Sequence, residues 1–357
     1  MIKGSSMTKK KTELAFASVV LMILVIFVHS MSECYTGYNK DSVQFAATLL
    51  FHRLSHFPVQ GFIFLSGLKL FLRRDKEFHL GKFYLGRLRR VIVPYVIVYL
   101  IFYLFFTVKK YISPSLGGFF YGMATGTLVS HFYFVVIICQ FYLLMPLWRL
   151  IEKKASPILA VTASLIMMII FMTYLPDLLK RFFGVDFSYN SHLFTNYIFY
   201  FVAGIFAGKF YEKFKAFLIA RRRGIITLWA VVGVIDCASM WLIETKRVYI
   251  PSADMFHVMY CISAILALLS LAVKYAERER KTDRALMLVD KASYNVYLIH
   301  PLFIFISESL LSRIGVRSLS VRFIIKVIIT YAVSILLCIG IEFLKEKIRS
   351  RQTHQKT

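Results

Sequence analysis

The chain has 357 residues, of which 58% are hydrophobic and only 18% charged, and its mean hydropathy is +0.66. Soluble proteins are about 45–50% apolar and about 25% charged. In this chain the apolar residues form runs that are long enough to cross a bilayer. Composition and run length together exclude the soluble, disordered, fibrous and disulfide-stabilised classes of protein. The net charge of +25 would suggest nucleic acid in a soluble protein. Basic loops that orient membrane helices explain it here, so we expect no nucleic-acid partner.

Taken in chain order, ten runs reach the length of about 20 apolar residues that a membrane span needs. They are 13–33, 44–72, 91–108, 129–148, 156–176, 192–211, 224–243, 255–276, 289–310 and 322–344. The second run is too long for a straight span and carries Pro58 and Gly61 at its centre. Because proline removes a backbone donor and clashes with the preceding turn, we expect a kink or a partly re-entrant segment there.

The charge distribution orients this bundle. If the N-terminus is cytoplasmic, most of the 44 Lys and Arg fall in the inner segments. Inner segments rich in Lys and Arg then alternate along the whole chain with outer loops that carry few of them. We therefore predict an all-α polytopic bundle with both termini cytoplasmic: a tail at 1–12, a ten-helix membrane domain at 13–345 and a tail at 346–357. The first run is longer than the apolar part of a signal peptide and lacks a cleavage site, so we expect a retained helix.

His29 lies near the outer end of the first predicted helix, in an otherwise apolar run. An ionisable group inside a span is costly and is a candidate for function, although a histidine bonded to a neighbouring helix or placed at the interface is the alternative. Glu33 follows one turn later on the same face, where it could orient the imidazole. We take both as candidate catalytic residues.

Two further clusters hold charge. Arg87, Arg89 and Arg90 precede Pro94 at the inner end of the third span, where basic residues are routine but guanidinium groups also suit phosphate. In the second run, His52 and His56 share a helical face beside Arg53. A zinc site would need a third ligand, so we expect no metal. Arg53 is expected to face a wet cavity and to pair with a carboxylate or a polar substrate.

Other chemistries leave no signature. There is no P-loop, and Ser66 in Phe64-Leu65-Ser66-Gly67 lacks the glycine pattern and preceding strand of a nucleophile elbow. The five cysteines contain no C-x-x-C pair. Few acidic residues lie within spans, which disfavours an ion-driven carrier.

Five motifs occur in the order of a known family. They are the apolar run ending in His29, Phe62-Ile63-Phe64-Leu65-Ser66-Gly67, Arg87-x-x-Arg90 before Pro94-Tyr95, His131-Phe132-Tyr133-Phe134 with Gln140-Phe141-Tyr142-Leu143, and Ser293 to Pro301. Over nearly its whole length the chain resembles the acyltransferase-3 family of bacterial membrane O-acyltransferases. The Gln140-Phe141-Tyr142 stretch and the Glu13-Leu14 start look closest to the branch that modifies poly-N-acetylglucosamine biofilm polysaccharide.

The resemblance implies a ten-helix protein of the bacterial cytoplasmic membrane. It would move an acetyl or succinyl group from cytosolic acetyl-CoA or succinyl-CoA to a sugar hydroxyl of an envelope polysaccharide or glycolipid. The catalytic histidine of the family falls on His29, and its arginine pair falls on Arg87 and Arg90. Many members carry an arginine upstream in the first helix, where this chain has Ser18, which puts donor contacts from that helix in doubt.

The remaining candidates complete the hypothesis. We assign substrate contacts to Arg53, His56, His131 and Tyr133, and we expect His29 to act as a general base or to carry the acyl group. His300 precedes Pro301, which frees a helical carbonyl that the imidazole could satisfy, so we favour a structural role for it. The alternatives are a polysaccharide exporter or flippase without acyl-transfer chemistry, and a sensor or scaffold that would tolerate loss of His29.

Overall fold

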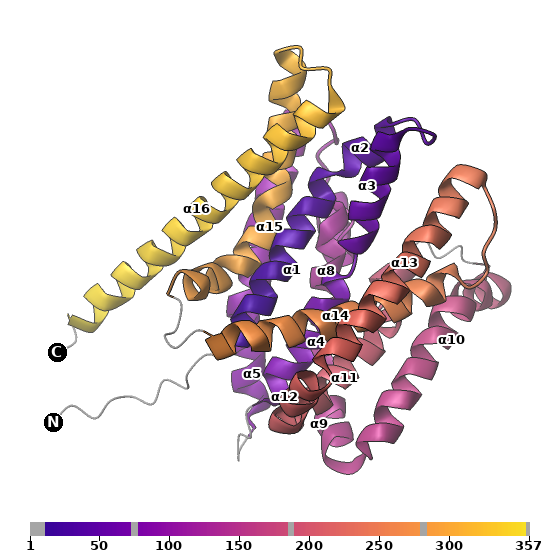
Figure 1. Ribbon diagram of the computed structural model, residues 1–357. Helices are drawn as coiled ribbons and strands as arrows, with labels where there is room; N and C mark the ends of the chain where they lie inside the picture. Colours follow the sequence, from indigo (N-terminus) through magenta and orange to yellow (C-terminus); the bar gives the residue numbers. More distant parts are fainter. Residues whose placement is uncertain (1–10, 73–77, 185–188, 279–283, 355–357) are drawn as a thin grey trace. The chain divides into compact units, whose positions relative to one another are not determined.

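The computed structural model describes residues 11–72, 78–184, 189–278 and 284–354, and every regular element within these ranges is a helix (Figure 1). The chain divides into two compact units. Unit 1 is formed by residues 1–58 and 215–357, and unit 2 by residues 59–214. The all-α class predicted from the apolar runs is confirmed. Most of the predicted tail at 1–12 lies outside the described residues.

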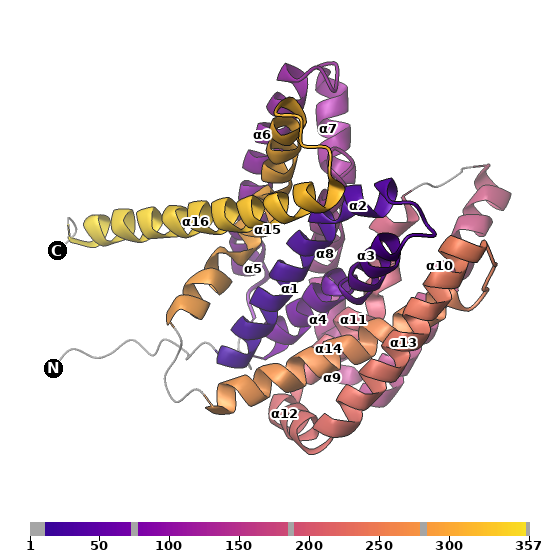
Figure 2. The same cartoon turned by 45° about the horizontal axis from the view of Figure 1, so that its top comes forward.

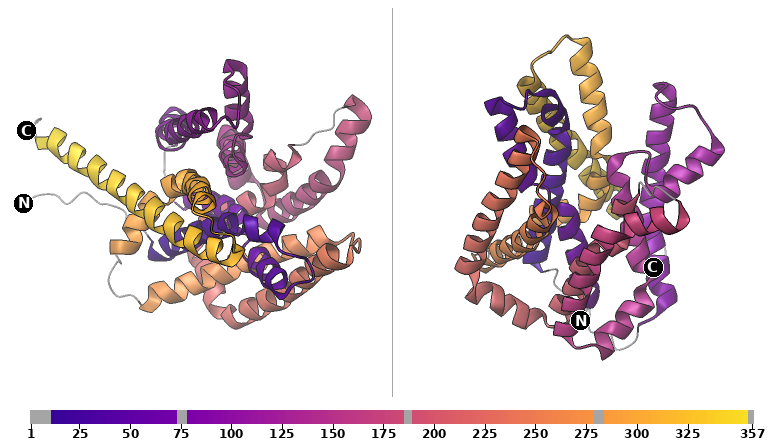
Figure 3. Two further views of the ribbon diagram at one scale, coloured as in Figure 1. Left: turned by 90° about the horizontal axis from the view of Figure 1, so that it is seen from above. Right: turned by 90° about the vertical axis from the view of Figure 1, so that its right-hand side faces the viewer.

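Unit 1 is built around the first helix. Its helices are α1 (Thr12–Ser30), α2 (Ser32–Gly37), α3 (Val43–Leu54), α13 (Arg222–Lys246), α14 (Ala253–Arg278), α15 (Arg284–Arg313) and α16 (Leu319–His354). α1 packs against α14, α15 and α16, and α13 packs against α14 and α3 (Figures 1 and 2). α16 is one unbroken helix, clearest in the left view of Figure 3, and it extends into the segment predicted as a tail.

Unit 2 holds shorter and more interrupted helices. They are α4 (Pro58–Phe71), α5 (Leu80–Arg87), a π-helical turn η1 (Leu88–Ile92), α6 (Val93–Val108), α7 (Leu116–Thr125), the 3₁₀ turn η2 (Ser130–Phe132), α8 (Tyr133–Leu143), α9 (Met145–Lys154), α10 (Pro157–Phe183), the 3₁₀ turns η3 (Asn190–His192) and η4 (Phe194–Tyr197), and α11 (Ile198–Lys209). α12 (Tyr211–Ala220) crosses the boundary between the units. α10 packs on α11, and α6 lies beside α7 (Figure 2).

Glycines set the closest helix crossing in unit 2. A Cβ on Gly204 of α11 would lie 2.2 Å from the carbonyl oxygen of Phe64, and one on Gly67 of α4 would lie 2.4 Å from that of Phe201. Gly208 meets the carbonyl of Leu68 in the same way, at 2.4 Å. Gly204 and Gly208 form a G-x-x-x-G pattern, which brings helix backbones together in membrane proteins because no side chain separates them. The sequence of α11 therefore fixes how it packs on α4.

Seven of the described helices are long and apolar enough to cross a membrane, or eight if the bent pair Leu116–Thr125 and Ser130–Leu143 is one span. The bend of 55° follows Gly126, whose φ of +71° ends α7 and whose absent Cβ would lie 2.9 Å from the backbone of Phe132. The predicted runs 44–72 and 192–211 form only shorter helices. The run 44–72 is interrupted between Leu54 and Pro58, as Pro58 predicted. Ten spans are not confirmed, and the cytoplasmic placement of the termini stays a prediction.

Candidate active site

His29 stands next to the last residue of α1 and faces α15. Its half-buried ring lies 5.3 Å, centroid to centroid, from the ring of His300. α1 and α15 run side by side along this contact (Figure 1). The end of the first helix and the middle of α15 therefore place two imidazoles together.

Pro301 explains the geometry of His300. Proline has no backbone N–H, so the carbonyl of Tyr297, four residues earlier, loses its helical donor. The Nδ1 of His300 lies 2.7 Å from that carbonyl oxygen, in a site where the side chain is 0% exposed. A carbonyl can only accept, so Nδ1 carries the proton and the acceptor nitrogen is Nε2. The predicted hydrogen bond is confirmed, and it also fixes the orientation of the ring beside His29.

Glu33 belongs to a charged cluster that joins α2, α15 and α16. Its carboxylate lies 2.7 Å from Nε of Arg322 and 2.6 Å from Nζ of Lys326, and Lys326 also pairs with Glu308 at 2.9 Å. Lys326 is 0% exposed. We call these four residues the Glu33 cluster. Two cations offset two carboxylates, as burial of charge requires, and the cluster holds α2 immediately after His29. The predicted action of Glu33 on His29 stays a prediction.

A second charged group lies across α3, α13 and α14. Arg53 makes a bidentate pair with Asp236, with Nε to Oδ2 at 2.9 Å and NH2 to Oδ1 at 2.8 Å. Asp236 is 0% exposed and also bonds Nδ1 of His257 at 3.0 Å. The prediction that Arg53 pairs with a carboxylate is confirmed. Its role as a substrate contact is untested.

More imidazoles surround this group. The ring of His56 lies 5.9 Å from that of His257 and 5.1 Å from that of His52, which in turn packs 4.7 Å from the ring of Tyr35. Tyr35 belongs to α2, which begins three residues after His29. His56 is exposed and His52 is half-buried, so small polar groups can reach these rings. Unit 1 thus gathers five histidines near the end of α1.

The arginine pair lies in unit 2, at a break in helical geometry. Pro94 cannot donate to the carbonyl of Arg90, and the helix responds with the π-helical turn η1, in which the N–H of Val93 bonds the carbonyl of Leu88. The guanidinium of Arg87 lies over the rings of Phe83 and Tyr142, at 5.1 and 5.0 Å. Arg90 is exposed. Cation–π contact with these two rings restricts the guanidinium, and a guanidinium fork suits bidentate binding of a phosphate.

The other two predicted substrate contacts also lie in unit 2, and they differ in access. His131 is 1% exposed and packs on Phe132 and Phe102, at 4.3 and 6.0 Å between centroids. A ligand would reach it only if that aromatic packing opened. Tyr133 is half-buried and stacks 5.4 Å from the ring of His192. Binding of substrate by either residue is untested.

Gln140 of the same motif shapes this region. Its amide donates to the carbonyl of His192 and accepts from the N–H of Phe194, each at 2.9 Å. The side chain thus bonds the two backbone groups on either side of Leu193, where η3 ends and η4 begins. An irregular segment cannot satisfy such groups by itself.

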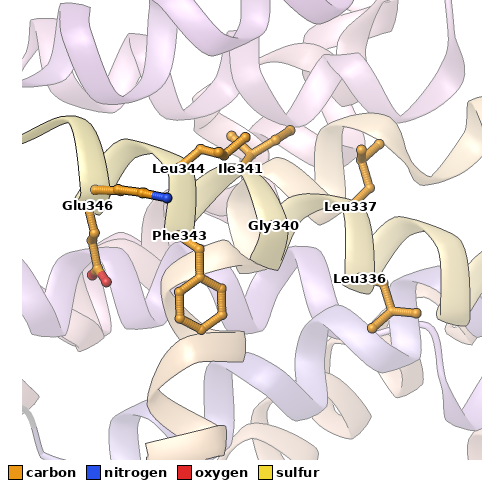
Figure 4. A pocket seen from close by; sticks show the side chains of 8 residues that line it. Leu336, Leu337, Gly340, Ile341, Phe343, Leu344 and Glu346 are labelled. Atoms are coloured by element: carbon orange, nitrogen blue, oxygen red, sulfur yellow. The ribbon is translucent and has the colours of Figure 1, made fainter.

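A groove along α16 is a different kind of feature. Figure 4 shows its side chains projecting from this one helix, and the residues that line it are Leu336, Leu337, Gly340, Ile341, Phe343, Leu344, Glu346 and Lys347. Exposed apolar side chains on one helix are what a lipid-facing surface presents. No group of three or more His, Cys, Asp or Glu that could hold a metal occurs in the part of the chain that the structure describes.

Sequence reasoning missed His257 and gave Asp236 no function. The two residues are 21 positions apart on different helices, and only the packing of α13 on α14 brings them into contact. One signal was available: an acidic residue inside an apolar run needs a basic partner, and His257 lies in the next run.

Comparisons with known proteins identify the family of the chain. The model of the acyltransferase-3 family, described as "Acyltransferase domain", matches residues 17–342, so the chain belongs to this family and is a membrane acyltransferase. It is similar to the "Putative membrane-bound acyltransferase YfiQ" of Bacillus subtilis (strain 168), with 25% identity over 314 residues, which cover 82% of this chain and 78% of that protein. No solved structure matches the chain significantly.

Proposed function

We propose that the protein is an O-acyltransferase that moves an acetyl or succinyl group from cytosolic acyl-CoA to a hydroxyl of an envelope or extracellular polysaccharide or glycolipid. The observation that carries the proposal is the position of His29 within the matched family domain: a half-buried imidazole at the end of α1, held beside His300. A neutral imidazole in such a site can serve as a general base or as a nucleophile.

Arg87 and Arg90 supply the donor site in this proposal. An acyl-CoA carries several phosphate oxygens, and the guanidinium fork of Arg87, which lies over the rings of Phe83 and Tyr142, would bind them bidentately. Arg53 and His56 of unit 1 would contact the acceptor, and the assignments of His131 and Tyr133 in unit 2 as substrate contacts stay predictions. Glu33, locked by Arg322 and Lys326, would support the end of α1.

The test compares cells that carry the wild-type protein with cells that carry His29→Ala, using mass spectrometry of surface glycans. We expect an added acyl mass on the wild-type glycan and its loss in the variant, with equal amounts of protein in the membrane. Glycan that is exported but never acylated would favour an exporter. Acylation that persists in His29→Ala would refute the assignment of His29.

The donor site has its own test. Arg87→Ala should raise the acyl-CoA concentration needed for half-maximal rate, whereas Lys82→Ala, an exposed basic residue of the same helix, should not. An unchanged response of Arg87→Ala to acyl-CoA would remove Arg87 from the donor site.

A further inference from the structure

Asp236 and His257 form a pair that the family motifs quoted above do not contain. Oδ2 of Asp236 lies 3.0 Å from Nδ1 of His257, and because a carboxylate accepts, that nitrogen carries the proton of the neutral ring. Nε2 is then the basic nitrogen. Both oxygens of Asp236 also accept from Arg53, at 2.8 and 2.9 Å, so the carboxylate cannot turn away from the imidazole. A buried carboxylate that orients a histidine is the arrangement of a general base.

The chemistry of the proposed function creates a need for such a base. If His29 itself takes the acyl group, its nitrogen is bonded to the acyl carbon and cannot accept the proton of the acceptor hydroxyl. A different base must then be near. His257 is a candidate by position, since its ring lies 5.9 Å from that of His56, whose neighbour His52 packs on Tyr35 of α2, the helix that directly follows α1 and His29.

We propose that His29 carries the acyl group and that the Asp236–His257 pair takes the proton of the acceptor hydroxyl. This inference rests on the proposed function. In the first step, Nε2 or Nδ1 of His29 attacks the thioester carbonyl, a C–N bond forms, the C–S bond breaks and coenzyme A leaves as its thiolate. In the second, the hydroxyl oxygen attacks the acyl carbon, its proton passes to Nε2 of His257, and the C–N bond breaks to release the ester and a neutral His29. The proton on His257 is returned to solvent, where the thiolate is protonated.

Access to Nε2 is consistent with this role. His257 is half-buried, and Sγ of Cys261, on the next turn of α14, lies 3.6 Å from its Nε2. A thiol is a weak hydrogen-bond donor, so a hydroxyl group can displace it. The exposed ring of His56 lies 5.9 Å from that of His257.

The two half-reactions separate the roles of the two histidines. Exchange of labelled coenzyme A into acyl-CoA, measured without acceptor in proteoliposomes, requires only the first step. We expect the wild type to exchange and to transfer. His29→Ala should do neither. His257→Asn should exchange at the wild-type rate and lose transfer by about 100-fold or more, the contribution typical of a general base.

The choice of asparagine keeps the variant folded. Its amide nitrogen stands close to the position of Nδ1 and can still donate to Asp236, while no basic nitrogen remains. Ser239→Ala is the matched control, because this buried hydroxyl bonds the backbone oxygen of Asp236 and touches neither side chain of the pair; it should exchange and transfer normally. Thermal unfolding in detergent checks that His257→Asn is folded.

The outcomes are distinct. Folded His257→Asn that transfers normally, or that loses exchange together with transfer, overturns the role of His257. A wild-type protein that transfers without exchange forms no acyl-enzyme and overturns the inference while the proposed function stands. A wild-type protein that supplies no acyl transfer to any glycan fraction refutes the proposed function itself.

Discussion

His300 shows how one residue can replace a backbone group. Its Nδ1–H occupies the carbonyl of Tyr297 that Pro301 leaves without a donor. We expect His300→Ala to lower the free energy of unfolding by about 1–3 kcal/mol, the cost of a buried polar group left without its hydrogen bond. Denaturation of the purified protein in detergent measures this loss.

The double variant His300→Ala/Pro301→Ala is the control for that interpretation. Alanine at 301 restores a backbone N–H four residues after Tyr297, so part of the lost stability should return. Acyl transfer should be reduced in both variants, because both lack the ring that lies 5.3 Å from that of His29. Equal stability of the single and double variants would show that the bond to Tyr297 contributes nothing.

Lys326 is the residue on which the Glu33 cluster depends, since it contacts both carboxylates and has no exposed surface. Lys326→Met should destabilise the protein by roughly 2–3 kcal/mol, less than the cost of about 3–5 kcal/mol for breaking a fully buried pair, because Glu33 and Glu308 are 28% and 29% exposed. Lys345→Met on the same helix removes a lysine that is 47% exposed and should cost no more than about 1 kcal/mol. Equal shifts in melting temperature for the two variants would contradict this difference.

At the scale of an element, the crossing of α4 and α11 depends on the absence of side chains. Gly204→Ala places a methyl group 2.2 Å from the carbonyl oxygen of Phe64, a backbone atom that cannot move without its helix. We expect a loss of at least about 3 kcal/mol, the upper part of the range for overpacking. Gly340→Ala in α16 meets nothing within 4 Å and should be neutral or stabilising by up to about 1 kcal/mol. Melting temperatures in one detergent compare the two; a stable Gly204→Ala protein would show that the helices can separate at no cost.

The helices also show which structural features could be predicted from the sequence alone. The apolar runs predicted long helices because length and hydropathy are local properties of the sequence. For the same reason, Pro58 predicted a helix break and Pro301 predicted a carbonyl without its helical donor. Contacts between residues on different helices could not be predicted in this way. Asp236 contacts His257 and Arg53, which lie on two other helices. Lys326 contacts Glu33 across 293 positions of the chain. The periodicity within one helix does not show which neighbouring helix its polar face will contact.

At the scale of the molecule, the positions of the charged loops distinguish two paths of the chain through the membrane. With ten spans, the loop at 109–115 is outside and the turn at 154–156 is inside. With eight spans, in which 44–72 and 192–211 do not cross, these two sides are exchanged. The eight-span path places Lys82, Arg87, Arg89 and Arg90 on the outer side, against the positive-inside rule. The positive-inside rule therefore predicts the ten-span path.

Single cysteines distinguish the two paths. The five native cysteines are first replaced by serine or alanine, and Ser113→Cys or Lys154→Cys is then added at an exposed position. With an impermeant maleimide on intact cells, we expect Ser113→Cys to react at once and Lys154→Cys to react only after permeabilisation. Tyr249→Cys, at a position 85% exposed, lies outside in both paths and controls for labelling. The reverse pattern at 113 and 154 would establish the eight-span path. It would place Arg87 and Arg90 on the side of the membrane opposite to the cytosol, and the proposed binding of cytosolic acyl-CoA by this arginine pair would then be wrong.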